Sequence, residues 1–277
     1  MPEANINGAR IYYQEHGEGF PLMLTHGLGS DHTMWINQVT VFKDKYRLVI
    51  WDCRGHGQSE VTDDGYSIAQ FTDDLYRLMQ HLGIERAHIG GLSMGGWISW
   101  SFALAHPEVT VSLVLSDSAG MPAGMENDKL LEKKKMFEAS AAIAETQGRE
   151  KLVDVTLSLM FSEEFIKNQP DVIKLVRQRI VCDPGVGYAR TIKGAFAEYW
   201  QTPSNEVEEN LSKIKAPTLI IVGEVDKLTP VSSQKALHRA IPGSRLEIIQ
   251  GSGHVPSVEQ PELWNKLVLE FLDGVEV

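Results

Sequence analysis

The sequence predicts an α/β fold with a mostly parallel sheet and a helical insert, and one observation supports each part. Short apolar runs that suit buried strands alternate with segments whose apolar residues recur at helical spacing. Residues 121–201 break this alternation, because they hold helical patterns and several prolines but no strand-like run. An all-helical insert between two strands of one sheet is typical of a cap over the sheet edge. We therefore predict a core domain of residues 1–120 and 205–277 and a helical cap, or lid, of residues 121–204.

The expected strands begin with an antiparallel pair. Asn7-Gly8 is a hairpin turn signal, and residues 10–13 after it are rich in β-formers. Six later runs are short and largely apolar, as in strands that are covered on both faces. They are residues 21–25, 46–51, 87–90, 111–115, 218–222 and 246–249.

The expected core helices carry clear boundary signals. Apolar residues in 68–82 repeat at steps of three and four, which gives one apolar stripe. Ser67 and Gln70 form a capping box before this helix, and Gly83 ends it. A C-terminal helix begins at Pro261 with similar spacing.

Composition bounds the partners of the protein. The chain has 277 residues, of which 43% are hydrophobic and 23% charged, as in a globular protein with a large core. The net charge of −11 argues against nucleic acid, whose phosphates need a basic face, and against anionic membrane surfaces. We expect a small-molecule substrate, no nucleic-acid partner and no membrane partner. The sequence leaves the oligomeric state open, a homodimer included.

Localisation follows from similarly simple features. The longest clean apolar runs are far below the roughly 18 residues of a membrane span, and the N-terminus lacks the pattern of a signal peptide. Cys53 and Cys182 are the only cysteines, so we expect free thiols and a cytoplasmic protein.

The strongest chemical signal is the motif G-x-S-x-G at residues 91–95. It follows an expected strand and precedes an expected helix that ends at Pro107, the context in which this motif forms a nucleophile elbow. We expect a strained turn that exposes the Ser93 hydroxyl, with Gly91 and Gly95 removing side chains that would collide there. Ser93 is therefore the predicted nucleophile.

A serine hydroxyl is a weak nucleophile at neutral pH and needs a base. In this turn type the order along the chain is serine, then acid, then histidine, and three histidines follow Ser93. His106 ends a helix and His238 lies inside one, whereas His254 lies in a glycine-rich loop directly after the last strand. Active sites of α/β sheets form at such strand ends, so His254 is the predicted base.

The acid that orients His254 should follow a strand between the serine and the histidine. Asp226 and Asp117 both lie at the carboxyl ends of expected strands, and Glu224 is a weaker alternative. On the residues alone this choice stays open.

The oxyanion of a tetrahedral intermediate needs fixed donors, which an oxyanion hole supplies. The first expected donor is the backbone N–H of Met94, the residue after the nucleophile. The second is the backbone N–H of Leu28, because Gly27 and Gly29 on either side let the backbone come close.

These motifs together resemble the α/β-hydrolase superfamily. The matching landmarks run in the family's order from about residue 20 to the end: residues 26–27, 52–59, 91–96, 223–226 with Pro230, and 253–254. The resemblance implies an α/β-hydrolase fold, with a mostly parallel eight-stranded sheet flanked by helices and a helical cap inserted after the sixth strand. It also implies Asp226 as the acid of a Ser93–His254–Asp226 catalytic triad, and a scaffold role for Asp52 and Arg54.

Within the superfamily, residues 91–96 and 52–59 look similar to 3-oxoadipate enol-lactonases, small carboxylesterases and cofactor-free perhydrolases. Ser93 speaks against the branches that use aspartate as nucleophile. We therefore expect a serine hydrolase, an esterase or lactonase, that cleaves a carboxylic ester or lactone through an acyl-enzyme. The alternatives are a carbon–carbon bond hydrolase of a diketone, disfavoured by Leu92 where those enzymes often have asparagine, and a ligand receptor that retains the triad.

The expected acyl pocket is apolar and lies under the cap. Its candidate residues are Trp35, Met121, Phe137, Phe161, Trp200, Leu228 and Val255. An anionic lactone would need a cation there, and the candidates are Arg149, Arg177, Arg179, Arg190 and Lys193. The basic run Lys133-Lys134-Lys135 is expected on a solvent-exposed helix face.

Neither a metal nor a cofactor is expected. The sequence lacks the paired spacings of metal sites and the glycine-rich phosphate loops of nucleotide sites. His26, Asp31 and His32 lie close together, but a turn explains them better than a metal site.

Overall fold

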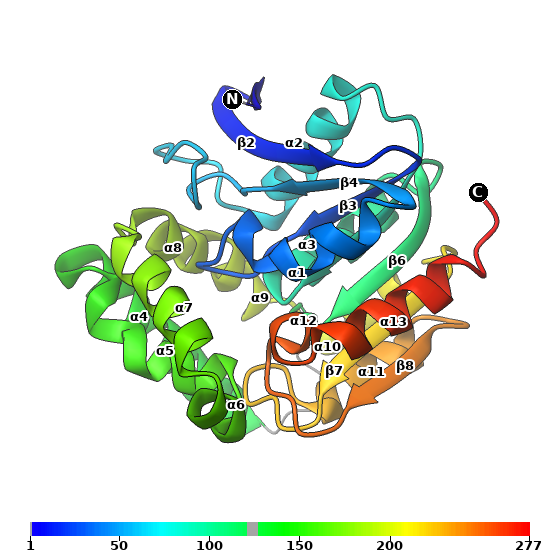
Figure 1. The fold of residues 1–277 in the computed structure, drawn as a ribbon. Coiled ribbons are helices and arrows are strands. Elements are labelled where there is room, and N and C mark those ends of the chain that lie inside the picture. Colours follow the sequence, from blue (N-terminus) through cyan, green and yellow to red (C-terminus); the bar gives the residue numbers. More distant parts are fainter. Residues whose placement is uncertain (1, 121–126) are drawn as a thin grey trace.

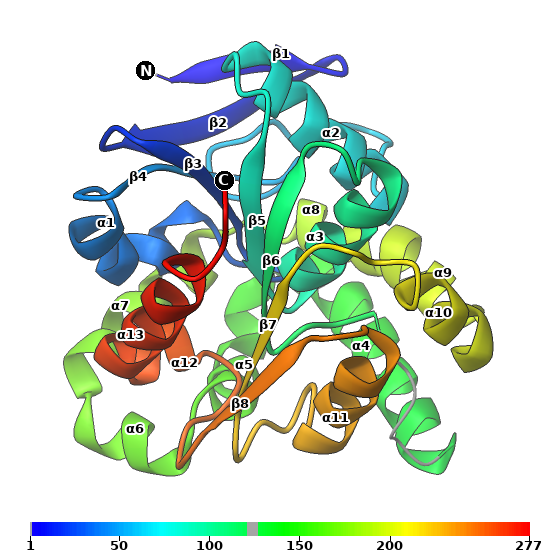
Figure 2. The same cartoon turned by 90° about the vertical axis from the view of Figure 1, so that its right-hand side faces the viewer.

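An eight-stranded sheet forms the centre of the protein. The computed structural model describes residues 2–120 and 127–277. The strand order is β1-β2-β4-β3-β5-β6-β7-β8, and β1 and β2 run antiparallel to their neighbours while the other strands are parallel. Figure 2 shows β1 and β8 at opposite edges. The strands are β1 Glu3–Ile6, β2 Ala9–His16, β3 Phe20–Thr25, β4 Tyr46–Trp51, β5 Ala87–Leu92, β6 Thr110–Ser116, β7 Thr218–Gly223 and β8 Arg245–Ile249.

Helices cover both faces of this sheet because its strands are apolar on both sides. Along β6, Leu113 and Leu115 belong to one hydrophobic core and Val114 to the other. The first core lies against α2, α3 and α11, and the second against α1 and α13. These helices are α1 Ile36–Phe42, α2 Ile68–His81, α3 Met94–Ala105, α11 Val231–Ala240 and α13 Pro261–Leu272.

The helical insert follows β6, as predicted, and Figure 1 shows most of its helices gathered on one side of the sheet. It comprises α4 Asn127–Gln147, η2 Arg149–Leu152, α5 Val153–Met160, α6 Glu163–Asn168, α7 Pro170–Cys182, α8 Val186–Thr191, the π-helical η3 Ile192–Phe196, α9 Ala197–Tyr199 and α10 Ser204–Leu211. The last helix, α10, packs on the core helices α3 and α11. The eight-stranded sheet and the insert after the sixth strand are thus confirmed, whereas the predicted domain boundaries stay a prediction.

Local signals explain where elements begin and end. Asn7 and Gly8 both have positive φ angles, 49° and 74°, and form the turn between β1 and β2. The Ser67 side chain accepts a hydrogen bond from the Gln70 N–H at the start of α2, and Gly83 after it has φ +64°. Among the helices of the described ranges, none is both long enough and apolar enough to cross a membrane.

Candidate active site

Ser93 lies at a strained turn between β5 and α3. Its φ of 57° and ψ of −114° fall where residues with a side chain rarely lie. Backbone hydrogen bonds hold the turn: Ser93 N–H donates to Ser116 at 2.9 Å, and Ala119 N–H donates to the Ser93 carbonyl at 2.9 Å. Neighbouring strand β6 therefore fixes a conformation that the serine would not adopt alone.

The two glycines of the motif allow this turn to pack. A Cβ atom at Gly91 would lie 2.4 Å from the Gly95 carbonyl carbon. A Cβ atom at Gly95 would lie 2.1 Å from the carbonyl oxygen of Thr25 at the end of β3. Both distances are far below van der Waals contact, so a side chain at either position would force the turn away from the sheet.

His254 and Asp226 meet at the carboxyl ends of β8 and β7. The Nδ1 atom of His254 lies 2.9 Å from Oδ2 of Asp226, and both side chains are buried. The His254 N–H donates to the Met160 carbonyl at 2.9 Å, so helix α5 of the insert helps to hold the histidine loop. Ser93 and His254 line the same cavity but share no hydrogen bond in the described chain, and such bonds are often long in unliganded sites.

The Asp226 carboxylate is well supplied with donors. The backbone N–H groups of Leu228 and Thr229 donate to Oδ1 at 2.7 and 3.1 Å, and the Thr229 hydroxyl lies 2.6 Å from Oδ2. Burial alone raises the pKa of Asp226, but the His254 charge and these hydrogen bonds outweigh it and lower the pKa to about 2. The ionised form is therefore the stable one beside His254.

Asp117, the alternative acid, has different contacts. Its carboxylate accepts hydrogen bonds from the Gly223 N–H and the Ser116 hydroxyl, both at 2.9 Å. Burial raises the pKa of Asp117 well above its usual range, and the neighbouring charge of Asp226 raises it further. Glu224, the weaker alternative, accepts from Gly251 at an exposed position instead of contacting His254.

Leu28 and Met94 present backbone N–H groups near Ser93. Met94 is the first residue of α3, so its N–H has no acceptor within the helix. The Leu28 N–H has no hydrogen bond to any residue that the structure describes, and Leu28 lines the cavity. A Cβ atom at Gly27 would lie 3.5 Å from the Cβ of Ser93, which shows how closely this loop approaches the serine.

Arg149 fastens this loop to the insert. Its guanidinium donates to the Gly29 carbonyl at 2.6 Å, pairs with Asp183 and lies 4.6 Å from the centre of the Tyr188 ring. The residue is only 2% exposed. The cation candidate Arg149 thus borders the cavity, but its charge already has a carboxylate partner.

The cavity under the insert has a volume of about 600 Å³ and a mainly apolar lining. Four of the predicted pocket residues line it: Phe137, Phe161, Leu228 and Val255. Met121 lies outside the described residues. Of the predicted cations other than Arg149, Arg179 also borders the cavity, at an exposed position, while Arg177 and Arg190 pair with aspartates and Lys193 pairs with Glu145.

Trp35 and Trp200 correct the prediction for the pocket, since neither lines this cavity. Trp35 is fully buried and its ring lies 5.6 Å from that of Trp264 in α13, so it serves the core under the sheet. Trp200 packs on Tyr199, at 4.5 Å between ring centres, within the aromatic cluster of the insert. Large aromatic residues gain most from burial in such cores.

Lys133 and Cys182 are among the cavity-lining residues that the sequence does not predict. Lys133, expected on a solvent-exposed face, lines the cavity together with Phe137 and Ser140. The spacing of these three residues places them on one face of α4, and this was the signal available in the sequence. Cys182, at the end of α7, is an exposed free thiol on the lining, whereas Cys53 is buried.

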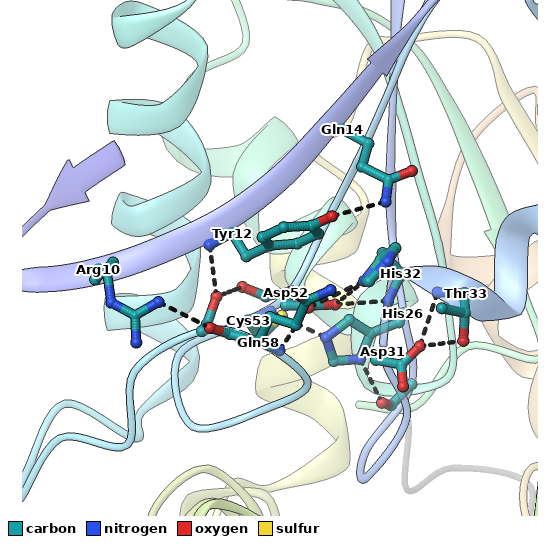
Figure 3. A network of polar contacts seen from close by, with 12 residues as sticks. Arg10, Tyr12, Gln14, His26, Asp31, His32, Thr33, Asp52, Cys53 and Gln58 are labelled. Carbon is teal, nitrogen blue, oxygen red and sulfur yellow. Dashed lines mark hydrogen bonds and ion pairs between the residues drawn. The ribbon is translucent and has the colours of Figure 1, made fainter. Parts of the chain in front are cut away.

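The cluster around Asp52 is built as scaffold. The Asp52 carboxylate accepts from the N–H groups of His32 at 2.6 Å and Gln58 at 2.8 Å, and it contacts the His32 ring at 2.9 Å (Figure 3). The His26 ring accepts from the Cys53 N–H at 2.9 Å, and Asp31 caps the short helix η1, His32–Trp35. Asp31, His32 and Asp52 bring three potential metal ligands together, as do Asp117, Asp226 and His254. These groups already bind one another or backbone N–H groups.

The chain belongs to the α/β-hydrolase family. The model of this family, described as alpha/beta hydrolase fold, matches residues 21–261. It is 29% identical over 274 residues to 3-oxoadipate enol-lactonase 1 of Acinetobacter baylyi, covering 98% of this chain and 96% of the relative. Two solved structures are similar at 28% identity. A thermophilic esterase from Thermogutta terrifontis, with malate bound, has a TM-score of 0.87 and covers 99% and 98% of the two chains. The enol-lactonase from Burkholderia xenovorans LB400 has a TM-score of 0.85 and covers 98% and 100%.

Proposed function

We propose that the protein is a serine hydrolase that cleaves a carboxylic ester or lactone. The observation that carries this proposal is the strained Ser93 at the start of α3, which opens onto the same cavity as the buried His254–Asp226 pair. A nucleophile, a base and a group that orients the base are the parts that acyl transfer requires.

Each residue has a role in the proposed reaction. The Ser93 hydroxyl attacks the carbonyl carbon while Nε2 of His254 takes its proton. The N–H groups of Leu28 and Met94 stabilise the oxyanion that forms on the carbonyl oxygen. Asp226 accepts the hydrogen bond from Nδ1 of His254, which leaves Nε2 free to act as the base.

The intermediate then collapses to an acyl-enzyme. The C–O bond to the leaving alcohol breaks, and His254 returns its proton to the alcohol oxygen. In the second half, His254 takes a proton from water, the resulting hydroxide attacks the acyl-enzyme, and Ser93 leaves with that proton. The products are a carboxylic acid and an alcohol, or one hydroxy acid (an enol-lactone gives the keto acid) if the substrate is a lactone.

The similar proteins support this reaction class. Those named above are called enol-lactonases and an esterase, and a further solved structure at 26% identity is described as an N-acyl homoserine lactone degrading enzyme. Esters and lactones share the same acyl–oxygen bond, so one site of this geometry serves both.

The Ser93→Ala variant tests the proposal. We expect a loss of at least about three orders of magnitude in kcat for a short ester, because the variant has no hydroxyl to form the acyl-enzyme. A fluorophosphonate probe should label the wild type at Ser93 and leave the variant unlabelled. Ser101→Ala, on the same helix, is the matched control and should keep wild-type activity. Substantial activity in Ser93→Ala, or labelling of another residue, would show that the proposal is wrong.

A further inference from the structure

Lys133 places a positive charge on the cavity wall next to the proposed triad. It lies in α4 and its ammonium donates to the carbonyl of Leu228. Leu228 in turn donates its N–H to Asp226, so the ammonium lies against the loop that carries the proposed acid. Lys133, Leu228, Ser93 and His254 all line the one cavity.

This ammonium has no carboxylate partner of its own among the described residues. Of the other cations on the cavity lining, Arg149 pairs with Asp183, and Arg179 is exposed to solvent, where a bound anion gains less. Asp226 is near enough for its charge to raise the pKa of Lys133. The Asp226 oxygens, however, already accept hydrogen bonds from His254, Leu228 and Thr229.

An ammonium held in this way is costly. It has three N–H donors, and a single backbone carbonyl engages one of them. Burial lowers the pKa of Lys133 to about 8, against the attraction of Asp226, which raises it. The remaining donors have no partner among the described residues, so they can bind an anionic group that enters the cavity.

We infer that the substrate is an ester or lactone bearing a carboxylate, and that Lys133 binds this carboxylate. This inference rests on the hydrolase activity proposed above. The remaining lining near Lys133 is mainly apolar, so a charge-assisted hydrogen bond there would be strong. The net charge of −11 repels anions in general. A cation inside the cavity offsets this repulsion locally and stabilises a bound anionic substrate.

Matched pairs of esters test this inference. The monomethyl esters of succinate, glutarate and adipate are compared with methyl butanoate, pentanoate and hexanoate, in which a methyl group replaces the carboxylate. Acetoxybutanoate against butyl acetate covers a carboxylate on the alcohol side. We expect the wild type to prefer at least one anionic ester by about tenfold or more in kcat/KM. Equal or better use of every neutral ester would overturn the inference.

Three variants assign that preference to Lys133. Lys133→Met keeps an unbranched apolar chain, one atom shorter than lysine, and removes the charge, so it should raise KM for the anionic ester about tenfold or more and leave KM for the neutral ester unchanged. Lys133→Arg should recover part of the preference. Lys135→Met, at an exposed position of the same helix, should behave like the wild type. If Lys133→Met lowers the turnover of both esters equally, Lys133 is a structural latch to Leu228 and the inference is wrong.

Binding separates this inference from the proposed function. Calorimetric titration of Ser93→Ala, with and without Lys133→Met, measures the affinity for monomethyl glutarate and for methyl pentanoate in the absence of turnover. We expect tighter binding of the anionic ester, lost with Lys133→Met. Equal affinities would refute the carboxylate site even if the fluorophosphonate labels Ser93. Failure of that label would refute the hydrolase whatever the titration shows.

Discussion

Asp226 and Asp117 show how contacts distinguish two residues that the sequence could not. Their carboxylate oxygens and a ring nitrogen of His254 all lie within 4.8 Å of one another. The Asp226 carboxylate receives hydrogen bonds that stabilise its charge, whereas Asp117 is held by Gly223 and Ser116 with its pKa raised by burial. Asp226 also contacts Nδ1 of His254 directly, at 2.9 Å, so it is the group placed to stabilise an imidazolium ion there.

Asn substitutions at the two positions should therefore differ in effect. Asp226→Asn should lower kcat by about three to four orders of magnitude, because an amide favours the wrong tautomer of His254. Asp117→Asn should cost less than about tenfold, since its amide oxygen can still accept from Gly223. Steady-state kinetics on one short ester measures both. A loss at Asp117 as large as that at Asp226 would contradict the assignment.

The site residues that the sequence predicts lie in local motifs, whereas those it does not predict depend on contacts between distant segments. Ser93, His254 and the glycines belong to local motifs whose turn geometry follows from neighbouring residues in the chain. Lys133 lies on a helix, and which helix face meets the cavity depends on packing between segments far apart in the sequence. Its contact with Leu228 spans 95 positions. Tertiary contacts of this kind leave little trace in a single sequence.

At the scale of elements, the β5–α3 unit depends on a close approach to β3. Helix α3 packs on β3, β5 and β6, and the carbonyl of Thr25 occupies the space where a Gly95 side chain would be. The helix and the Ser93 turn therefore share one fixed position relative to the sheet. The sequence motif indicates this unit, but the identity of the strand that it touches comes from the topology.

Gly95→Ala should disturb this unit. We expect it to lower the free energy of unfolding by about 1–3 kcal/mol, because the added methyl group overlaps the Thr25 carbonyl oxygen. Ester hydrolysis should fall as well, since Ser93 must move with the turn. Denaturant unfolding and kinetics measure the two effects. Gly274→Ala is the control, because its Cβ would meet nothing closer than 3.5 Å. Wild-type stability of Gly95→Ala would disprove the clash.

At the scale of the whole molecule, large aromatic side chains are shared between the cores and the cavity lining. Trp35 meets Trp264 of the C-terminal helix, and Trp200 meets the aromatic cluster of the insert. Hydrophobicity predicts that such residues are buried, but it does not say whether they are buried in a core or along a cavity. The strand pattern, by contrast, is local and repeated, so the sheet and the position of the insert could be predicted.

Buried histidines make the stability of the whole molecule sensitive to acid. Burial lowers the pKa of His88 to about 4, and burial with the charge of His26 lowers that of His56 to about 4. Between pH 4 and 6.5 the unfolded chain therefore binds more protons than the folded protein, and stability falls as the pH falls through this range. Each group should remove on the order of 1 to 2 kcal/mol between pH 7 and 5.

His88→Asn should weaken this acid sensitivity. The asparagine side chain can keep the hydrogen bond to the Ser112 hydroxyl, which lies 2.8 Å from Nδ1 of His88, but it takes up no proton. The loss of unfolding free energy from pH 7 to pH 5, measured with denaturant, should be smaller than in the wild type. His81→Asn, an exposed position, should leave the loss unchanged. An unaltered loss in His88→Asn would contradict the prediction.

The two free thiols of the chain offer a way to watch the cavity. Cys53 is inaccessible and burial raises its pKa, so a maleimide dye should attach to Cys182 alone. That thiol ends helix α7 on the cavity lining, where a dye would sense whatever enters beneath the insert. The natural sequence therefore already contains a single labelling site for fluorescence measurements of substrate entry, without any cysteine having to be added or removed.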